Sequence, residues 1–326
     1  MRDNVIPVIF IILLLIMGCN PTPRYQKAEG MIWNTLYHIT YEGPSELKDS
    51  VIPVLEEMGK SLSIFDPGSI VSRLNVADSL EVDEKFRTVY DKSLEIYRLS
   101  KGNFDPTVSP LITAWGFGIG HKASSDTLAI DSILNFVGIE KTHRSGKMIL
   151  KDDKRIQFNF SAIAKGYGCD AVGEMFKRNG VNDYMIEIGG EVVVSGRSPS
   201  GNDWRISIDT PVFDIEASHE AALVISITDK GIATSGNYRN FKIENGEKLA
   251  HTISPTSGRP FFSEILSATV VAPTCMEADA LATACMASDA KMAKTILTTY
   301  KADGLFIFSD SVWMTPGFRK MVVTEQ

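Results

Sequence analysis

A carboxylate and a hydroxyl lie four positions apart in residues 275–283, Cys-Met-Glu-Ala-Asp-Ala-Leu-Ala-Thr. On a helix, Asp279 and Thr283 would share one face, because residues i and i+4 are neighbours. Both side chains are hard oxygen ligands that suit Mg²⁺, and Mg²⁺ in proteins usually bridges to substrate phosphates. The segment therefore has two interpretations, part of a magnesium site or a helical turn with a solvated Asp.

A second polar segment, residues 160–167, has the sequence Phe-Ser-Ala-Ile-Ala-Lys-Gly-Tyr and precedes a predicted helix. Small residues before a helix leave backbone N–H groups open to an anion, and Lys165 adds a positive charge. A simple helix start is the other interpretation. Residues 187–191, Glu-Ile-Gly-Gly-Glu, lie between two predicted strands and by themselves favour a hairpin turn.

Hydroxyl, amide and basic side chains gather in residues 234–240 and 251–260. His251 is one of five histidines in the chain. Among these neighbours an imidazole can act as a general base toward a hydroxyl nucleophile. A structural role for a lone histidine remains the alternative.

The elements that must position these residues follow from hydrophobic spacing. Helical spacing predicts helices over 85–100, 170–179 and 277–287. Runs of β-branched and aromatic residues predict strands over 184–188, 191–196, 204–209, 222–227, 267–272 and 304–309. Because strands come in runs, we expect an α+β fold with substantial antiparallel sheet. Residues 31–326 contain no convincing linker and are expected to form one two-lobed catalytic domain.

Composition narrows the class of function. The 326 residues are 44% hydrophobic and 22% charged, a globular mixture. The net charge of −7 offers no basic surplus for phosphates, so no nucleic-acid partner is expected. No stretch after residue 20 has the length of a membrane span.

The first residues indicate export. Residues 4–17, NVIPVIFIILLLIM, are short for a membrane span and suit the core of a signal peptide. They lead to Gly18-Cys19, which resembles the lipobox of bacterial lipoproteins. We expect residues 1–19 to be a lipoprotein signal peptide, with Cys19 as the lipidation site, and residues 20–30 to be a tether. A plain signal peptide with a chance cysteine is the alternative.

Taken in order, segments across residues 31–320 resemble the ApbE family of FAD:protein FMN transferases. The matching pieces are SIFDP (63–67), SRLN (72–75), GNFD (102–105), VSPL (108–111), WGFG (115–118), SAIAKGY (161–167), EIGG (187–190), ATSGNYR (233–239), HTI (251–253) and APTCMEADALAT (272–283). The resemblance implies an ApbE-like, T-fold-like architecture. It also implies a Mg²⁺-dependent transfer of FMN from FAD to a threonine hydroxyl, with release of AMP.

The resemblance carries over to individual residues. Asp279, Thr283 and the backbone carbonyl of Ala164 would bind Mg²⁺. His251 would be the base for the acceptor threonine, and Lys165 would face phosphate or the metal-site carboxylates. The residues expected to line the FAD site are Met31, Phe65, Asn103, Phe104, Asp105, Ser161, Tyr167 and Ile253.

The chain departs from the family pattern at several positions. Phe65 stands where Tyr is usual, and Ile32-Trp33-Asn34 replaces the usual small residues after Met31. Asn159 and Ser254 each replace a frequent Asp, and the second change puts the support of His251 in doubt.

Two other functions compete with the transferase. One is a Mg²⁺-dependent FAD pyrophosphatase that gives FMN and AMP, and the other is a flavin-binding lipoprotein without turnover. The family implies a partner protein that carries the target threonine in an exported domain of a membrane redox complex. A lipid anchor would hold the chain on the periplasmic side of a bacterial membrane, with the inner membrane favoured over the outer.

Overall fold

The computed structural model describes residues 25–117, 127–209, 221–236, 241–244, 247–250 and 252–323. No helix among these residues combines the length and the apolar character needed to cross a bilayer. The apolar run 4–17 and Cys19 lie outside the described residues.

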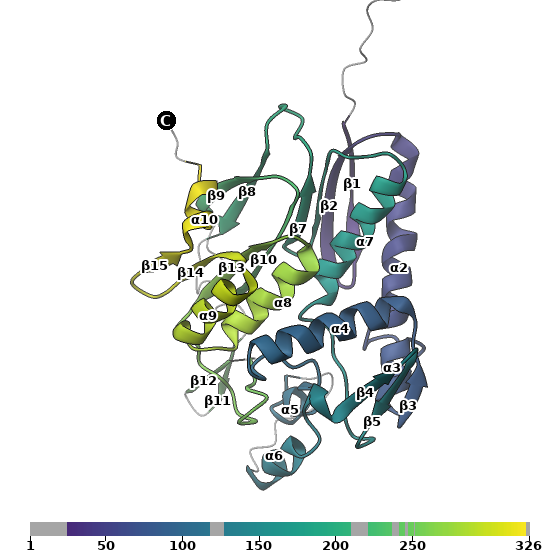
Figure 1. Ribbon diagram of the computed structural model, residues 1–326, viewed down its shortest axis with the longest axis vertical. Helices are drawn as coiled ribbons and strands as arrows, with labels where there is room; N and C mark the ends of the chain where they lie inside the picture. Colours follow the sequence, from purple (N-terminus) through teal and green to yellow (C-terminus); the bar gives the residue numbers. More distant parts are fainter. Residues whose placement is uncertain are drawn as a thin grey trace, which may run out of the picture.

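An eight-stranded sheet runs through the middle of the molecule (Figure 1). Every pair of neighbouring strands in it is antiparallel. In spatial order the strands are β1 (Tyr25–Ile32), β2 (Thr35–Glu42), β6 (Tyr184–Ile188), β7 (Glu191–Ser195), β10 (Lys230–Gly236), β13 (Ser267–Ala272), β14 (Asp303–Ile307) and β15 (Val312–Met314). The predicted α+β class with antiparallel sheet is confirmed.

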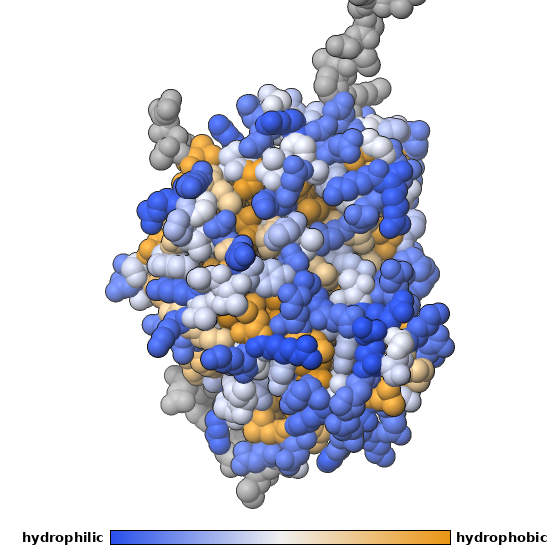
Figure 2. All heavy atoms as spheres, in the orientation of Figure 1, coloured by the Kyte–Doolittle hydropathy of each residue, from blue (hydrophilic) through white to orange (hydrophobic). Residues whose placement is uncertain are grey.

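One face of this sheet is covered by the helices α2 (Val51–Leu62), α7 (Ala164–Arg178), α8 (Cys275–Met286) and α9 (Ala290–Tyr300) (Figure 1). Helix α8 packs on β10 and β13 and has ten buried residues out of twelve, so it is apolar almost all round, as a central helix must be. Helix α4 (Glu84–Leu99) contacts both α8 and α9. On the surface, the side of the molecule that carries these helices is mostly hydrophilic, and apolar atoms show only in gaps (Figure 2).

The other face is covered by the hairpin β8 (Trp204–Asp209) and β9 (Ala221–Ile227) together with helix α10 (Pro316–Met321). Trp204, Ile225 and Phe318 from these elements form one apolar cluster with Val194 and Leu305 of the sheet. This cluster buries one face of the strands β7 and β14.

A second lobe lies below α4 in Figure 1. It contains the three-stranded sheet β3 (Ser79–Glu81), β5 (Met148–Lys151) and β4 (Thr142–Ser145), with helices α3 (Ile70–Asn75), α5 (Ser109–Ala114) and α6 (Thr127–Leu134). Two 3₁₀ turns, η1 (Ser45–Ser50) and η2 (Ile139–Lys141), and the hairpin β11 (Phe241–Glu244) and β12 (Glu247–Ala250) complete the described elements.

A buried ammonium holds this lobe together. Lys151 is 8% exposed. Its Nζ donates to the carbonyl oxygens of Leu74, Lys154 and Ile156 at 2.9 Å and of Asn75 at 3.3 Å. One side chain thus satisfies the end of α3 and the loop after β5, which would otherwise leave carbonyl groups unpaired.

Two boundaries differ from the prediction by more than two residues. Helix α7 begins at Ala164 instead of residue 170. The prediction was late because two glycines in the first turns are poor helix formers, and close packing requires them there. Strand β1 begins at Tyr25, inside the predicted tether 20–30, and pairs with β2 along its whole length. Of the predicted tether, residues 20–24 lie outside the described part.

Candidate active site

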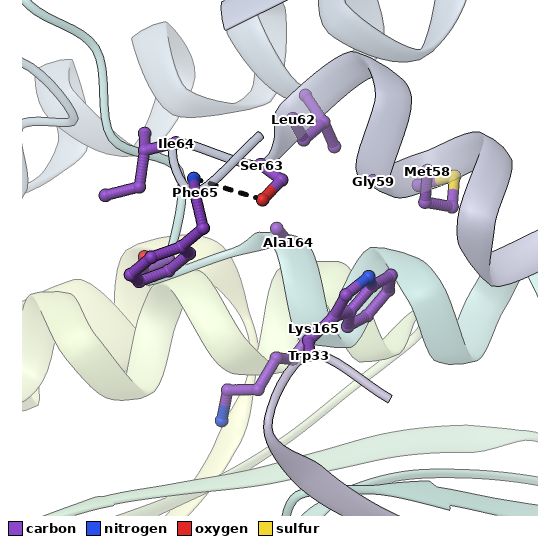
Figure 3. A pocket seen from close by; sticks show the side chains of 10 residues that line it. Trp33, Met58, Gly59, Leu62, Ser63, Ile64, Phe65, Ala164 and Lys165 are labelled. Atoms are coloured by element: carbon purple, nitrogen blue, oxygen red, sulfur yellow. Dashed lines mark hydrogen bonds between the residues drawn. The ribbon is translucent and has the colours of Figure 1, made fainter. Parts of the chain in front are cut away.

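Two pockets meet at the first turn of α7. The apolar pocket has a volume of about 240 Å³ and is lined by Trp33, Met58, Gly59, Leu62, Ser63, Ile64, Phe65, Ser161, Ala164 and Lys165 (Figure 3). The polar pocket has a volume of about 360 Å³. Its lining includes Asn103, Phe104, Asp105, Ser161, Lys165, Glu191, Thr234, Ser235, Ile253, Asp279 and Thr283. Ser161 and Lys165 line both pockets, which are therefore neighbours.

Trp33 forms a wall of the apolar pocket. It lies in the turn between β1 and β2 with a φ of +51°, a left-handed conformation that is unusual for a bulky residue. A Cβ at Gly168 would lie 2.7 Å from Cη2 of Trp33, so glycine is needed there for the indole to pack on α7. Phe65 stands at the same pocket with 71% of its surface exposed (Figure 3).

A charge cluster lies in the polar pocket. Nζ of Lys165 lies 2.5 Å from Oε2 of Glu191, and the amide of Gly166 donates to Oδ2 of Asp279 at 3.0 Å. Burial and then the charge of Asp279 raise the pKa of Glu191, and burial raises the pKa of Asp279. Burial alone would lower the pKa of Lys165, but the two carboxylates outweigh it and raise that pKa.

This donor set fits a divalent cation. Glu191 and Asp279 are 4% and 3% exposed, and one lysine balances only one of the two carboxylates. Among the described residues, no donor bonds to the second oxygen of Asp279, Oδ1. Oγ1 of Thr283, one turn further along α8, lies 3.3 Å from Oγ of Ser235. Ala164 lies two residues before Gly166 and lines the apolar pocket.

A metal site made only of His, Cys, Asp and Glu side chains is not present in the described part of the chain. No group of three or more His, Cys, Asp or Glu residues there could hold an ion. The predicted set differs in kind, since it combines one carboxylate, one hydroxyl and one backbone carbonyl. Such a site leaves positions for water or substrate oxygens, as Mg²⁺ prefers.

The predicted FAD residues around Asn103 lie at the polar pocket. Nδ2 of Asn103 donates to Oγ of Ser288 at 2.9 Å, and Phe104 is buried. The carboxylate of Asp105 is hydrogen-bonded within the protein. It accepts from the amide and hydroxyl of Thr107, both at 2.7 Å, and from the amide of Ile139 at 3.2 Å. Burial raises the pKa of Asp105 to about 6.

The other predicted FAD residues are divided, because Ile253 lines the polar pocket whereas Met31 and Tyr167 line neither pocket. Met31 is 65% exposed and lines neither pocket. Tyr167 is half-buried and also lines neither, because it packs against the main apolar cluster. Ile253 is buried and bridges to Pro260 at the polar pocket. His251 lies outside the described residues, as do residues 237–240.

The two Asp replacements keep local hydrogen bonds. Oδ1 of Asn159 accepts from the amide of Ser161 at 2.9 Å and from its hydroxyl at 2.6 Å, as a carboxylate oxygen would. Oγ of Ser254 accepts from the amide of Ser257 at 3.2 Å and lies 3.0 Å from the hydroxyl of Thr256. Ser254 therefore stabilises its own turn.

Sequence reasoning missed Trp33 and Glu191 as site residues. Trp33 gives no signal, since a left-handed tryptophan after a strand is not predictable from composition. Glu191 does give one, because it is the single charged residue at the head of the buried strand Glu191–Ser195. An acid in such a strand requires a partner.

Comparisons with known proteins agree on one family. The model of the ApbE family matches residues 33–306. An FAD:protein FMN transferase of Vibrio cholerae serotype O1 is 35% identical over 287 residues, which cover 84% of each chain. The FAD:protein FMN transferase of Escherichia coli K12 is 29% identical over 344 residues, 96% of each chain.

Solved structures agree as well. The flavin transferase ApbE from Vibrio cholerae superposes with a TM-score of 0.82 at 29% identity, covering 91% of this chain and 99% of the other. The apo form of the Pseudomonas stutzeri flavinyl transferase ApbE has a TM-score of 0.82 at 26% identity, covering 91% and 96%.

Proposed function

This chain belongs to the ApbE family of FAD:protein FMN transferases, and from that premise we propose that it transfers FMN to a threonine hydroxyl of an acceptor protein in a Mg²⁺-dependent reaction. The bond that forms joins the FMN phosphorus to the threonine Oγ. The bond that breaks is the pyrophosphate P–O bond to AMP, and the threonine proton passes to a base, for which His251 is the candidate.

One observation supports this proposal above the others, namely that an aromatic pocket and a charged pocket meet at Lys165. FAD has a ring system at each end and a pyrophosphate between them. Trp33 and Phe65 offer flat apolar surface to one ring system. Lys165 and the N-terminus of the 15-residue helix α7 provide positive potential for the phosphates.

The cation would be held by Asp279 and Thr283 of the polar pocket together with the carbonyl of Ala164, a residue that lines the neighbouring apolar pocket. When bound, Mg²⁺ offsets the charge that develops on the departing AMP phosphate. Lys165 pairs with Glu191 and so keeps one buried carboxylate balanced, which leaves Asp279 available to the cation. Because both carboxylates are buried, water competes little with these interactions.

We further propose that Cys19 is lipidated and holds the enzyme at the periplasmic side of a bacterial membrane. The lipobox-like Gly18-Cys19 after an apolar run supports this location. The acceptor would then be an exported domain of a membrane redox complex.

The test uses a soluble chain from residue 20 with FAD, Mg²⁺ and a threonine-bearing domain of a flavin-carrying redox subunit. Intact-mass spectrometry detects FMN on the acceptor, and chromatography follows AMP and free FMN. Asp279→Ala should abolish covalent FMN and AMP release together. Asp310→Ala, an exposed carboxylate that lines neither pocket, is the matched control and should keep both.

Each product pattern has a definite meaning. Covalent FMN with an equal amount of AMP establishes the transferase with this acceptor. AMP with only free FMN, from the wild type and with several acceptors, favours the pyrophosphatase. Bound and unchanged FAD favours the flavin carrier. Turnover that survives Asp279→Ala would refute the metal assignment.

A further inference from the structure

Helices α7 and α8 carry the two halves of the proposed cation site and touch along one seam. On α7 the seam consists of Gly166, Cys169 and Asp170, which share a helix face at spacings of three and four. A Cβ at Gly166 would lie 2.3 Å from the carbonyl oxygen of Cys275, so the two backbones are in direct contact. Cys169 and Cys275 are both buried in the same apolar cluster.

Asp170 bonds to the start of the other helix. Its Oδ1 accepts from the amide of Cys275 at 2.9 Å, and its Oδ2 accepts from the amide of Met276 at 2.8 Å. These amides belong to the first turn of α8, where backbone donors have no partner within the helix. Thr274 already caps α8 locally through the amide of Glu277, so Asp170 adds a second cap that comes from a neighbouring helix.

The bond from Gly166 lies one turn further along the same seam. The amide of Gly166 donates to Oδ2 of Asp279. Gly166 lies four residues before Asp170 on α7, and Asp279 lies four residues after Cys275 on α8. The two helices are thus tied at two successive turns, and α8 cannot slide along α7 without breaking both ties.

We propose that Asp170 is a positioning residue that holds the first turn of α8 on α7 and thereby sets Asp279 and Thr283 against Lys165 and Ala164. Its role in turnover rests on the function proposed above. Asp170 lines neither pocket, so it acts on the site through the helices and not through the substrate.

The carboxylate needs its charge to accept from two amides. Burial raises the pKa of Asp170 to about 7, against the two amide bonds that lower it. The titratable groups around it are Glu174 and Lys177 on α7, Glu277 on α8, Tyr184 on β6, and Asp229 and Lys230 at β10. The test is therefore run at pH 8, where the ionised form predominates.

The experiment compares Asp170→Asn with Thr274→Ala in the full chain, solubilised in detergent. Both changes remove part of the cap of α8, but only Asp170→Asn breaks the link to α7. In Asp170→Asn an amide nitrogen faces one backbone N–H, so that tie is lost. Calorimetry measures Mg²⁺ binding without FAD, hydrogen exchange follows residues 275–279, and kinetics give kcat and the KM for FAD.

Asp170→Asn should weaken Mg²⁺ binding and lower kcat, each by about tenfold or more, as for other residues that orient metal ligands. The KM for FAD should change by less than about threefold, and residues 275–276 should exchange faster. Thr274→Ala should leave Mg²⁺ affinity within about threefold of wild type, although its loss of thermal stability should be similar to that of Asp170→Asn.

Equal effects of the two variants on Mg²⁺ affinity would reduce Asp170 to a stabilising cap and overturn the proposal. So would wild-type Mg²⁺ binding in Asp170→Asn. If that variant does not fold, Asp170→Glu replaces it, and wild-type Mg²⁺ affinity with the longer side chain would overturn the proposal equally. A wild-type chain that binds Mg²⁺ but transfers no FMN would refute the proposed function and leave the binding comparison valid.

Discussion

Trp33 has a backbone conformation that costs free energy, and its surroundings compensate for that cost. Its indole lies against Gly168 of α7 and lines the apolar pocket. It also joins the two main apolar clusters of the molecule. A bulky residue with positive φ is held only where packing determines it, and such positions concentrate at binding sites.

Replacement of Trp33 should therefore weaken FAD binding. Trp33→Ala removes the ring that a planar ligand would contact, and we expect the Kd for FAD to rise on the order of tenfold. Trp33→Phe keeps an aromatic wall and should lose on the order of threefold or less. Calorimetric titration without Mg²⁺ measures the Kd with no turnover.

Phe262→Ala is the matched control for Trp33, since Phe262 is 61% exposed and lines neither pocket. It should bind FAD as the wild type does. If Trp33→Ala also kept the wild-type Kd, FAD would not use the apolar pocket.

Asp105 makes stability depend on pH in a direction opposite to most carboxylates. Its folded pKa of about 6 lies above the value of about 4 for an unfolded Asp. Between these values the folded state binds more protons, so the free energy of unfolding falls as the pH rises. Relative to Asp105→Asn, the wild type should lose up to about 3 kcal/mol between pH 4 and pH 7.

Guanidinium unfolding of both proteins across this pH range tests the prediction. The quantity compared is the slope with pH, because Asp105→Asn also loses hydrogen bonds at every pH. Parallel curves would show that Asp105 titrates alike in the folded and unfolded states.

Among single residues, the sequence correctly predicted that Asp279 and Thr283 lie on one helix, while their role as Mg²⁺ ligands stays a prediction. Asp279 and Thr283 at a spacing of four were identified because one helix face must present both, and the structure brings both to the polar pocket. Tyr167 shows the limit of this reasoning, because its position in the motif does not reveal that it packs against the apolar core instead of lining either pocket.

At the scale of elements, Lys151 determines how α3 joins the small sheet. Lys151→Met removes a donor from four carbonyl groups that are buried or part-buried, of which, among the described residues, only that of Leu74 keeps a second donor, the amide of Ala77 at 3.1 Å. The free energy of unfolding should fall by about 3 kcal/mol, because buried unpaired polar groups are costly. Chemical denaturation measures this change.

Lys147→Met serves as the control, since Lys147 is 65% exposed on the same hairpin and its Nζ lies 3.8 Å from Glu81. Its effect on the free energy of unfolding should stay within about 0.5 kcal/mol. Equal effects of the two substitutions would mean that the carbonyls around Lys151 find other partners.

The six predicted strands all appear within two residues of their expected bounds, whereas β1, β2, β10 and β15 of the central sheet were not predicted. Buried β-branched runs such as Ser267–Ala272 admit few other interpretations, and the strand appears at the predicted residues. The start of α7 was placed too late because Gly166 and Gly168 weaken helical propensity. Both glycines are required by close contacts with residues far away in the sequence, Gly166 with Cys275 and Gly168 with Trp33. A local sequence pattern does not reveal such contacts.

At the scale of the whole molecule, the described part of the fold begins with β1 at Tyr25. The Tyr25 hydroxyl donates to the carbonyl of Arg197 at 2.8 Å, and Ala28 is buried in the sheet. A chain that starts at residue 24 should unfold within about 2 °C of a chain that starts at residue 20. A chain that starts at residue 33 lacks β1 and should unfold roughly 5 °C lower or more.

Differential scanning calorimetry of the three chains makes this comparison. Equal transitions for all of them would mean that β1 contributes nothing to the cooperative unit. A lower transition for the chain from residue 24 would place structure in residues 20–23.

The order of motifs along the chain was enough to infer the family and the α+β class, because ordered matches over most of a chain rarely arise by chance. The meeting of two pockets at Lys165 was not predictable. It depends on α7, α8, β7 and the turn before β2 arriving at one point, which is a property of the packed molecule.

Among the described residues, the central sheet leaves one long side without a partner strand. It ends in β15, three residues long, at one margin and in β1, eight residues long, at the other. A free margin of that length offers unpaired backbone groups to which a strand of a second molecule can add. Lys27 and Glu29 are exposed along β1, and charged residues at such a margin disfavour aggregation. Neutral replacements at these two positions would thus remove a protection against fibrous self-association while leaving the site intact.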